Sequence, residues 1–244
     1  MSRMVGGHTV SSFTEELRRL DNRLQALGGM AREQLDRAIE ALESRNSENA
    51  EAVILRDSEV DQIENGIHED ALRILALREP KATDLRYILT SLRNAADLER
   101  MGDLAENIAK HAVVLKNHGN LPELDAFLEM ARLVSTRLET TLQALSEDDA
   151  DLAMTVWNLD REVDERFNTF VSDLTANMES HSSSVAAGVH LLFMAKSVER
   201  IGDLSTNLAE NTYYLVKGTY PRSPRPQVDE VGNPKGRQPA RSTP

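Results

Sequence analysis

The chain has 244 residues, and its 40 acidic and 28 basic side chains give a net charge of −12. This excess of negative charge argues against general binding to nucleic acid or to anionic membranes, because both would repel it. The absence of cysteine excludes disulfides, thiolate metal sites and a cysteine nucleophile. Scarce aromatic residues, at 4%, together with abundant Leu, Ala, Glu and Arg, favour an all-α helical bundle.

The sequence gives no sign of a membrane-spanning or exported segment. No run approaches the roughly 20 consecutive apolar residues that a spanning helix needs. Residues 1–12 lack the apolar stretch of a secretory signal. We therefore predict a cytoplasmic protein that reaches a membrane only through its partners.

Three helices are predicted in the first half of the chain. The first covers about residues 11–44. The second begins after Asn46 or Ser47, either of which can cap it, and it ends before Pro80. Pro80 suits the first turn of the third helix, which is expected to end near Gly119.

Three more helices are predicted in the second half. Pro122 suits the first turn of the fourth helix. Residues 146–149 resemble a capping box that opens the fifth, with Ser146 as the cap. The serine cluster 182–184 opens the sixth helix, and Gly218 closes it.

The two ends of the chain differ from this helical region. Residues 1–10 are predicted to form a flexible N-terminus. Residues 220–244 hold six of the eight prolines, and five basic residues there stand against two acidic ones. This Pro-rich tail has almost no apolar content, so we predict that it is disordered, and we assign it no role.

An internal repeat divides the helical region. The sequence AADLERMGDL at 95–104 recurs as AKSVERIGDL at 195–204, and DSEVD at 57–61 recurs as DREVD at 160–164. The repeat predicts two tandem, similar three-helix bundles. We place the first at residues 11–118 and the second at residues 119–219.

Each repeat carries two pairs of carboxylates. The two acids of a pair are four residues apart, which puts them on one face of a helix. They lie in or next to apolar stripes, where an unpaired charge is expensive. The sequence leaves two kinds of charge compensation open for these carboxylates. One is a cation held by oxygen ligands from adjacent helices, and the other is a salt-bridge network with Arg86, Arg100 and Arg200.

Catalytic groups are not evident elsewhere. The histidines do not recur between the halves, and we interpret them as surface or packing residues. No serine is placed with a histidine and an acid, and no Gly-rich phosphate loop occurs. We predict no catalytic residues and no enzymatic activity. A carboxylate-bridged metal-dependent enzyme and a purely structural helical scaffold are the alternatives.

The repeated sequences ERMGD at 99–103 and ERIGD at 199–203 resemble the paired E-R-x-G-D signature of the PhoU family. The segment 80–86, PKATDLR, resembles the P-x-A-x-D-L-R segment of that family, and the resemblance extends over about residues 11–219. The second half lacks this segment, which allows the two acidic sites to differ. The resemblance implies transition-metal ions (iron, zinc or manganese), or magnesium, at the acidic motifs. The ligands that it implies are Asp57, Asp61, Glu99, Asp103, Asp160, Asp164, Glu199 and Asp203.

The same resemblance implies a role in signalling. A PhoU protein is expected to repress phosphate uptake and the phosphate-starvation response as an adaptor. It would link the ATPase of the phosphate ABC transporter to a sensor histidine kinase. We also expect a homodimer, and no nucleic acid among the partners.

Overall fold

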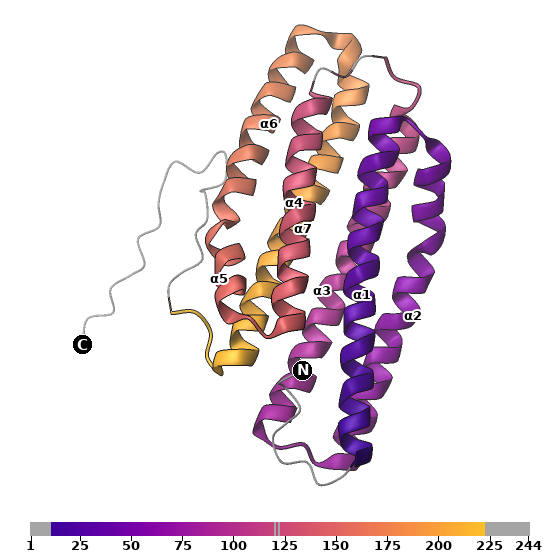
Figure 1. The fold of residues 1–244 in the computed structure, drawn as a ribbon. Helices are drawn as coiled ribbons and strands as arrows, with labels where there is room; N and C mark the ends of the chain where they lie inside the picture. Colours follow the sequence, from indigo (N-terminus) through magenta and orange to yellow (C-terminus); the bar gives the residue numbers. More distant parts are fainter. Residues whose placement is uncertain (1–10, 120, 122, 223–244) are drawn as a thin grey trace, which may run out of the picture.

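The computed structural model describes residues 11–119, 121 and 123–222, and these form long α-helices joined by short connections (Figure 1). The prediction of an all-α fold is confirmed. The predicted flexible N-terminus, Pro122 and most of the predicted disordered tail lie outside the described residues. None of the helices among the described residues combines the length and the apolar character that spanning a bilayer requires. The helices are α1 (Ser11–Ser44), α2 (Ser47–Arg78), α3 (Ala82–Leu115), α4 (Leu124–Glu147), α5 (Ala150–Asn158), α6 (Asp160–Ser180) and α7 (Val185–Lys217), with the short 3-10 helix η1 (Ser182–Ser184) before α7.

Several predicted helix ends are confirmed by local hydrogen bonds. The side chain of Asn46 caps α2 by accepting from the backbone N–H of Glu48 at 2.9 Å. Gly218 ends α7 with a left-handed φ of 79°, and its N–H donates to the carbonyl of Tyr214. Both ends depend on contacts within a few residues, which is why the sequence predicts them.

Two predicted helix starts are wrong. Pro80 lies before α3 instead of in its first turn, because the extended Lys81 is the N-cap. Asp149, and not Ser146, caps the helix after α4, since its Oδ1 accepts from the N–H groups of Asp151 and Leu152 at 2.9 Å each. The carboxylate of Asp149 therefore satisfies two N–H groups at the start of α5.

The predicted fifth helix is divided into α5 and α6. Leu159 interrupts it at φ −89° and ψ 0°, and its N–H donates to the carbonyl of Val156 at 3.0 Å. The interruption tightens the turn without ending the helical path. As a result, Asp160 becomes the first residue of α6 instead of an interior helical residue.

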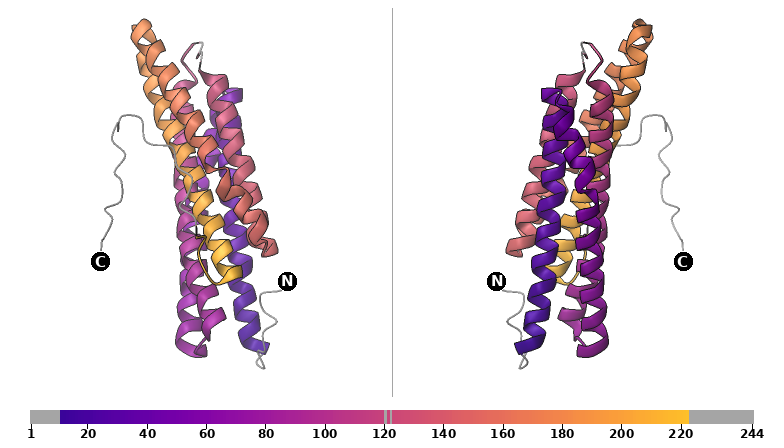
Figure 2. Two further views of the ribbon diagram at one scale, coloured as in Figure 1. Left: turned by 90° about the vertical axis from the view of Figure 1, so that its left-hand side faces the viewer. Right: turned by 90° about the vertical axis from the view of Figure 1, so that its right-hand side faces the viewer.

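The helices form two layers (Figures 1 and 2). In the view of Figure 1, α1 and α4 lie in front of α3 and α7, while α2 and α6 lie at the two sides. α1 contacts α2, α3 and α4, and α7 contacts α3, α4, α5 and α6. The pair formed by α3 and α7 thus joins the first three helices to the last four. The residue boundaries that we assign to the two repeats stay a prediction.

One hydrophobic core runs through both halves. It contains fully buried side chains from the first three helices, such as Leu24, Ile67 and Leu98, and others from the later helices, such as Phe127 and Val198. Each such side chain contributes about 1.5–3 kcal/mol when it leaves water. A shared core of this kind holds the two repeats as one packed unit.

A buried carboxylate ties α2 to α1. Asp70 is 3% exposed, and its oxygens lie 2.9 Å from Nη2 of Arg19 and 3.0 Å from Nη1 of Arg23. It also pairs with Arg73 on its own helix. Three cations compensate the burial of one anion, so this contact orients α2 on α1 at little desolvation cost to the half-exposed arginines.

Replacing Asp70 by alanine should lower the free energy of unfolding by about 2 kcal/mol, because charge-assisted hydrogen bonds to a buried group are lost. The expected fall in Tm is roughly 4–8 °C for a chain of this size, measured by circular dichroism. The control is Glu165→Ala, which breaks only the exposed pair with Arg161 and should change Tm by little. Equal effects of the two substitutions would contradict the role of Asp70.

Candidate functional site: two acidic clusters

The packing of α3 against α7 sets the position of the candidate site. The helices are antiparallel, and two contacts fix their register. Asn211 Nδ2 donates to Asn94 Oδ1 at 2.8 Å, and Asn107 Nδ2 donates to Ser197 Oγ at 3.1 Å. In this register the two E-R-x-G-D motifs lie near the middle of the helix pair, opposite each other.

The glycine of each motif allows its helix to approach its neighbours closely. A Cβ atom on Gly102 would lie 2.9 Å from Gln34 Oε1 and 3.3 Å from Val60 Cγ1. A Cβ on Gly202 would lie 3.3 Å from Val163 Cγ1. These distances explain why glycine occupies helix interiors that alanine would stabilise by roughly 1 kcal/mol. They also bring α2 and α6 close to the acids beside each glycine.

The first acidic cluster lies between α3 and α2. Asp61 and Asp103 both remain exposed, yet the pKa of Asp103 is raised above its usual value, first by partial desolvation and then by the negative charges of Asp61 and Glu106. Lys110 and Arg100 oppose this shift in pKa without cancelling it. The structure therefore brings Asp61 and Asp103, two of the predicted ligands, into mutual repulsion.

The other two predicted ligands of the first repeat belong to the same two helices. Glu99 is half-buried on α3, one turn before Asp103. Asp57 lies on α2, one turn before Asp61, but its side chain is outside the described part of the structure. The first cluster is thus defined here by Asp61, Glu99 and Asp103, with the backbone of Asp57 beside them.

The second acidic cluster lies between α7 and α6. Burial raises the pKa of Glu199 most, and the charges of Asp203 and Asp164 raise it further. Lys196 opposes this rise through an ion pair, with its Nζ 2.8 Å from Glu199 Oε1. Three of the four predicted ligands of this repeat therefore influence one another.

The fourth predicted ligand of this repeat, Asp160, has a different environment. It is buried at the start of α6, and its Oδ1 accepts a hydrogen bond from Thr206 Oγ1 at 2.7 Å. The nearby guanidinium of Arg137 pairs with Glu162 at 2.7 Å, and the charge of Asp160 acts on it as well. Asp160 is thus bound into the packing of α6 against α7.

The salt-bridge alternative finds partial support, from Arg100, which was expected, and from Lys196, which was not. Arg86 lies over the ring of Tyr214, 5.7 Å from its centroid, and Arg100 lowers the pKa of Asp103. The cation that pairs with Glu199 is Lys196 instead of an arginine. Protein cations therefore offset part of the clustered negative charge in each repeat.

Sequence comparison identifies relatives along most of the chain. The PhoU domain family model matches residues 24–112 and again residues 127–212. The chain belongs to the PhoU domain family. It is 38% identical over 223 residues to a Caulobacter vibrioides protein named phosphate-specific transport system accessory protein PhoU homolog, covering 91% of this chain and 97% of that one. A Pseudomonas aeruginosa protein of the same name is 34% identical, covering 87% and 88%.

Solved structures agree with this assignment. The crystal structure of PhoU from Pseudomonas aeruginosa has a TM-score of 0.83 and 34% identity, covering 85% of this chain and all of that one. The structure of the phosphate transport system regulatory protein PhoU from Streptococcus pneumoniae has a TM-score of 0.79 and 28% identity, covering 85% and 98%. The predicted PhoU resemblance is therefore confirmed along with the fold.

The two acidic clusters of this PhoU-family chain suit a metal ion by their donor atoms but not by the arrangement of their described side chains. Carboxylate oxygens are hard donors that suit magnesium, manganese or iron. Yet among the side chains that the structure describes, no three His, Asp or Glu are arranged so that they could hold a metal ion. The side chain of Asp57 is not among those described. The assignment of the eight carboxylates as metal ligands stays a prediction.

A histidine pair that the sequence does not predict lies at the far end of the same two helices. His111 Nδ1 lies 2.8 Å from His190 Nδ1, and the ring of His111 stacks on Phe193 with centroids 5.5 Å apart. These histidines do not recur in the repeat, so the repeat gives no signal for them. Only the register of α3 on α7 brings them together.

Replacing Asp103 by asparagine should stabilise the metal-free protein at pH 7. A raised folded-state pKa means that the folded protein binds more protons than the unfolded chain between the two pKa values, so its stability rises as pH falls through that window. Asp103→Asn removes this dependence, and we expect a rise in Tm of roughly 1–2 °C at pH 7, which solvent screening keeps small.

The matching measurement is Tm against pH, with chelator present. Asp173→Asn, at an exposed position of α6, is the control and should leave the profile unchanged. A lower Tm for Asp103→Asn in chelator at pH 7 would contradict this prediction, because it would show that the surrounding groups stabilise the ionised carboxylate of Asp103.

Proposed function

We propose that this PhoU-family protein is a cytoplasmic negative regulator of phosphate uptake and of the phosphate-starvation response. It acts without catalysis, as an adaptor between the ATPase of a phosphate ABC transporter and a sensor histidine kinase. The observation that carries the proposal is the match, over about nine-tenths of the chain, to relatives named phosphate-specific transport system accessory proteins. A structural neighbour is named a phosphate transport system regulatory protein.

The physical character of the fold supports an adaptor. A single core joins both repeats, so surfaces on α2, α3, α6 and α7 keep fixed positions relative to one another. Two partners that bind different surfaces of this rigid unit would therefore be held at a fixed distance and orientation. The net charge of −12 favours association with basic partner surfaces and raises the rate of encounter.

Deleting the protein should derepress phosphate-starvation genes in cells grown in rich phosphate, because the kinase would lose its repressing input. Transcript levels of the phosphate-uptake genes provide the readout, with the plasmid-borne wild-type chain as control. Purified protein should also retain the transporter ATPase or the kinase in a pull-down. Normal repression in the deletion strain would show that the regulatory assignment is wrong.

A second function, cation binding at the two acidic clusters, is favoured by one observation. Asp61 and Glu106 raise the pKa of Asp103, and Asp203 and Asp164 raise that of Glu199. Like charges held together bind a divalent cation more readily than isolated carboxylates do. In the first cluster the cation would be held by Asp61, Glu99 and Asp103 with Asp57. In the second it would be held by Asp164, Glu199 and Asp203, with Asp160 already bonded to Thr206. In both clusters binding would require the described side chains to shift, because as placed no three of them are arranged to hold a metal ion.

Alanine at four positions tests this binding. The quadruple variant with Glu99, Asp103, Glu199 and Asp203 replaced should lose most of the iron, zinc or manganese that elemental analysis finds in the wild-type protein. In the metal-loaded protein, Asp103→Asn alone should lower Tm, because the variant has lost a ligand of the stabilising cation. In chelator the same substitution should raise Tm, because the variant lacks the charge repulsion that a cation would otherwise relieve. Unchanged metal content in the quadruple variant, with helicity preserved, would end the metal hypothesis.

A further inference from the structure

Because of the repeat, the two ends of the α3–α7 pair contain equivalent sequence positions. The side chains exposed at these positions differ between the two ends. At one end, the turn after α7 reaches onto α3. Tyr220 stacks on Tyr214 with ring centroids 4.4 Å apart, and its hydroxyl accepts from Arg93 Nη1 at 2.9 Å. Gly218 makes this turn possible because of its positive φ. The chain thus provides its own aromatic contact at Arg93.

At the other end, the residue equivalent to Arg93 is Phe193, which stands 100 positions later. Phe193 is 54% exposed and is surrounded along α3 and α7 by other half-exposed apolar side chains. We call this surface the Phe193 patch. Its members are Val114, Val185, Val189 and Phe193, with His111 and His190 between the two helices. Grouped exposed apolar side chains of this kind mark interaction sites more often than single ones.

The two segments that form the Phe193 patch contain no acidic residues of their own, unlike most of the chain. The segments 107–118 of α3 with its connection and 182–198 of η1 and α7 contain no Asp or Glu, whereas the chain has 40 acids in 244 residues. They lie side by side, as the contact between His111 and His190 shows. The titratable side chains of these segments are Lys110, Lys116, Lys196, His111, His118 and His190.

Lys110 and Lys196 are held beside the patch by acids of the neighbouring turns, through pairs with Glu106 at 2.5 Å and with Glu199 at 2.8 Å. Both side chains remain half-exposed. A carboxylate from another molecule could therefore reach either ammonium group. Elsewhere the acidic surface would repel the same carboxylate.

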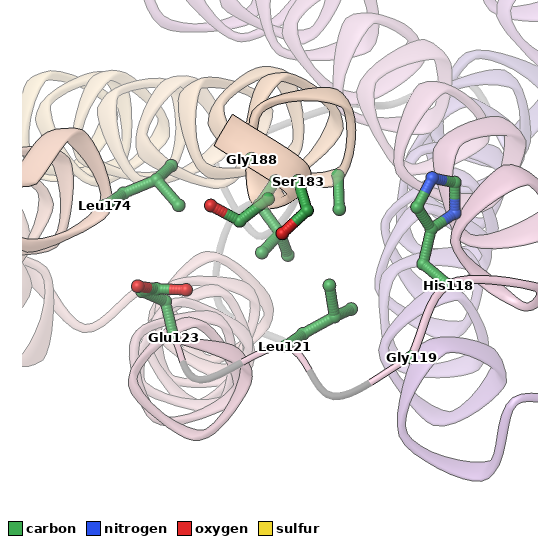
Figure 3. Close-up of a pocket in the computed structure, with 10 residues that line it drawn as sticks. His118, Gly119, Leu121, Glu123, Leu174, Ser183 and Gly188 are labelled. Carbon is green, nitrogen blue, oxygen red and sulfur yellow. The ribbon is translucent and has the colours of Figure 1, made fainter. Parts of the chain in front are cut away.

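An apolar recess adjoins the patch. A cavity of about 230 Å³ lies where the α3–α4 connection meets the start of α7, with His118 and Glu123 in its wall (Figure 3). Leu121, Leu174 and Leu191 also line the recess, and Glu123 accepts a hydrogen bond from Asn177. The ring of His118 lies 6.5 Å from that of His190, which joins the recess to the patch. A recess of this size holds one side chain of a docked segment.

We propose that the Phe193 patch docks an apolar segment of a partner protein that carries flanking carboxylates. The exposed aromatic and valine side chains provide the apolar contact, and Lys110 and Lys196 select for acidic neighbours. A second copy of this chain fits less well, because a symmetric contact would bring the same cationic segments face to face. The proposal rests on the adaptor function above, since it assigns a surface to one of those partners.

The test uses a matched pair of substitutions. Val189 and Leu89 are equivalent in the repeat, on α7 and α3, and are 40% and 47% exposed. We would measure the Kd of the purified full-length chain for the transporter ATPase and for the cytoplasmic part of the kinase. Val189→Ser and Phe193→Ser should each weaken binding to one partner by roughly tenfold or more, while Leu89→Ser should not. Higher salt should also weaken binding of the wild-type chain, because salt screens the attraction between the lysines and the partner's carboxylates.

Each outcome decides between the claims, provided that circular dichroism shows every variant folded. Wild-type binding that Val189→Ser and Phe193→Ser leave unchanged, or that Leu89→Ser weakens equally, overturns the patch and leaves the adaptor function standing. Failure of the wild-type chain to bind either partner removes the adaptor function and the patch with it. If Phe193→Ser turns a dimer into a monomer in sedimentation without altering partner affinity, the patch joins two copies of the chain instead.

Discussion

The register of α3 against α7 is the constraint on which the rest of this structure depends. Asn94, Asn211, Asn107 and Ser197 carry polar groups at or near the interface of these helices, and their two hydrogen bonds can form in one alignment only. Sliding one helix by a turn would leave buried amide groups unpaired, at about 1–3 kcal/mol each. Apolar packing alone tolerates such shifts far better, so the polar contacts specify the alignment and the apolar core supplies the stability.

From this register follows the approximate twofold relation between the repeats. Antiparallel helices that carry the same motif near their centres place the two acidic clusters on opposite sides of the pair, one against α2 and the other against α6. The same relation makes the ends of the pair equivalent, yet they carry different residues. Arg93 receives Tyr220, while Phe193 stacks on His111 and remains half-exposed. Duplication thus supplies the framework, and single substitutions give each end its own chemistry.

What the sequence predicts is what depends on neighbouring residues or on the repeat itself. The span of α1, the cap at Asn46 and the end of α7 at Gly218 are set within a few residues, and all three are confirmed. The interruption at Leu159, the three arginines around Asp70 and the contact between His111 and His190 depend on tertiary packing. No local pattern distinguishes these residues from ordinary helical ones, which is why the sequence does not predict them.

The acidic clusters show the same boundary between pattern and packing. Spacing and repetition predict that Asp61 and Asp103, or Asp164 and Glu199, lie on facing helices, and the effect of one charge on the pKa of the other supports this. Spacing does not predict that Thr206 would bind Asp160 or that Lys196 would reach Glu199. These internal partners decide how much negative charge remains for a cation, so the ligand set depends on packing as well as on motif.

The distribution of charge gives the two regions opposite tendencies within one fold. Near the centre of α3 and α7, neighbouring carboxylates raise the pKa of Asp103 and of Glu199, and a chain selected for stability alone would not retain that repulsion. At the Phe193 end of the same helices, carboxylates are absent over two adjoining segments although they are abundant elsewhere. Neither feature adds to the stability of the fold, because exposed lysines and exposed acids suit a helix surface equally well. Under the two proposals made above, the repulsion is relieved by a bound cation, and the segments without acids receive an acidic partner.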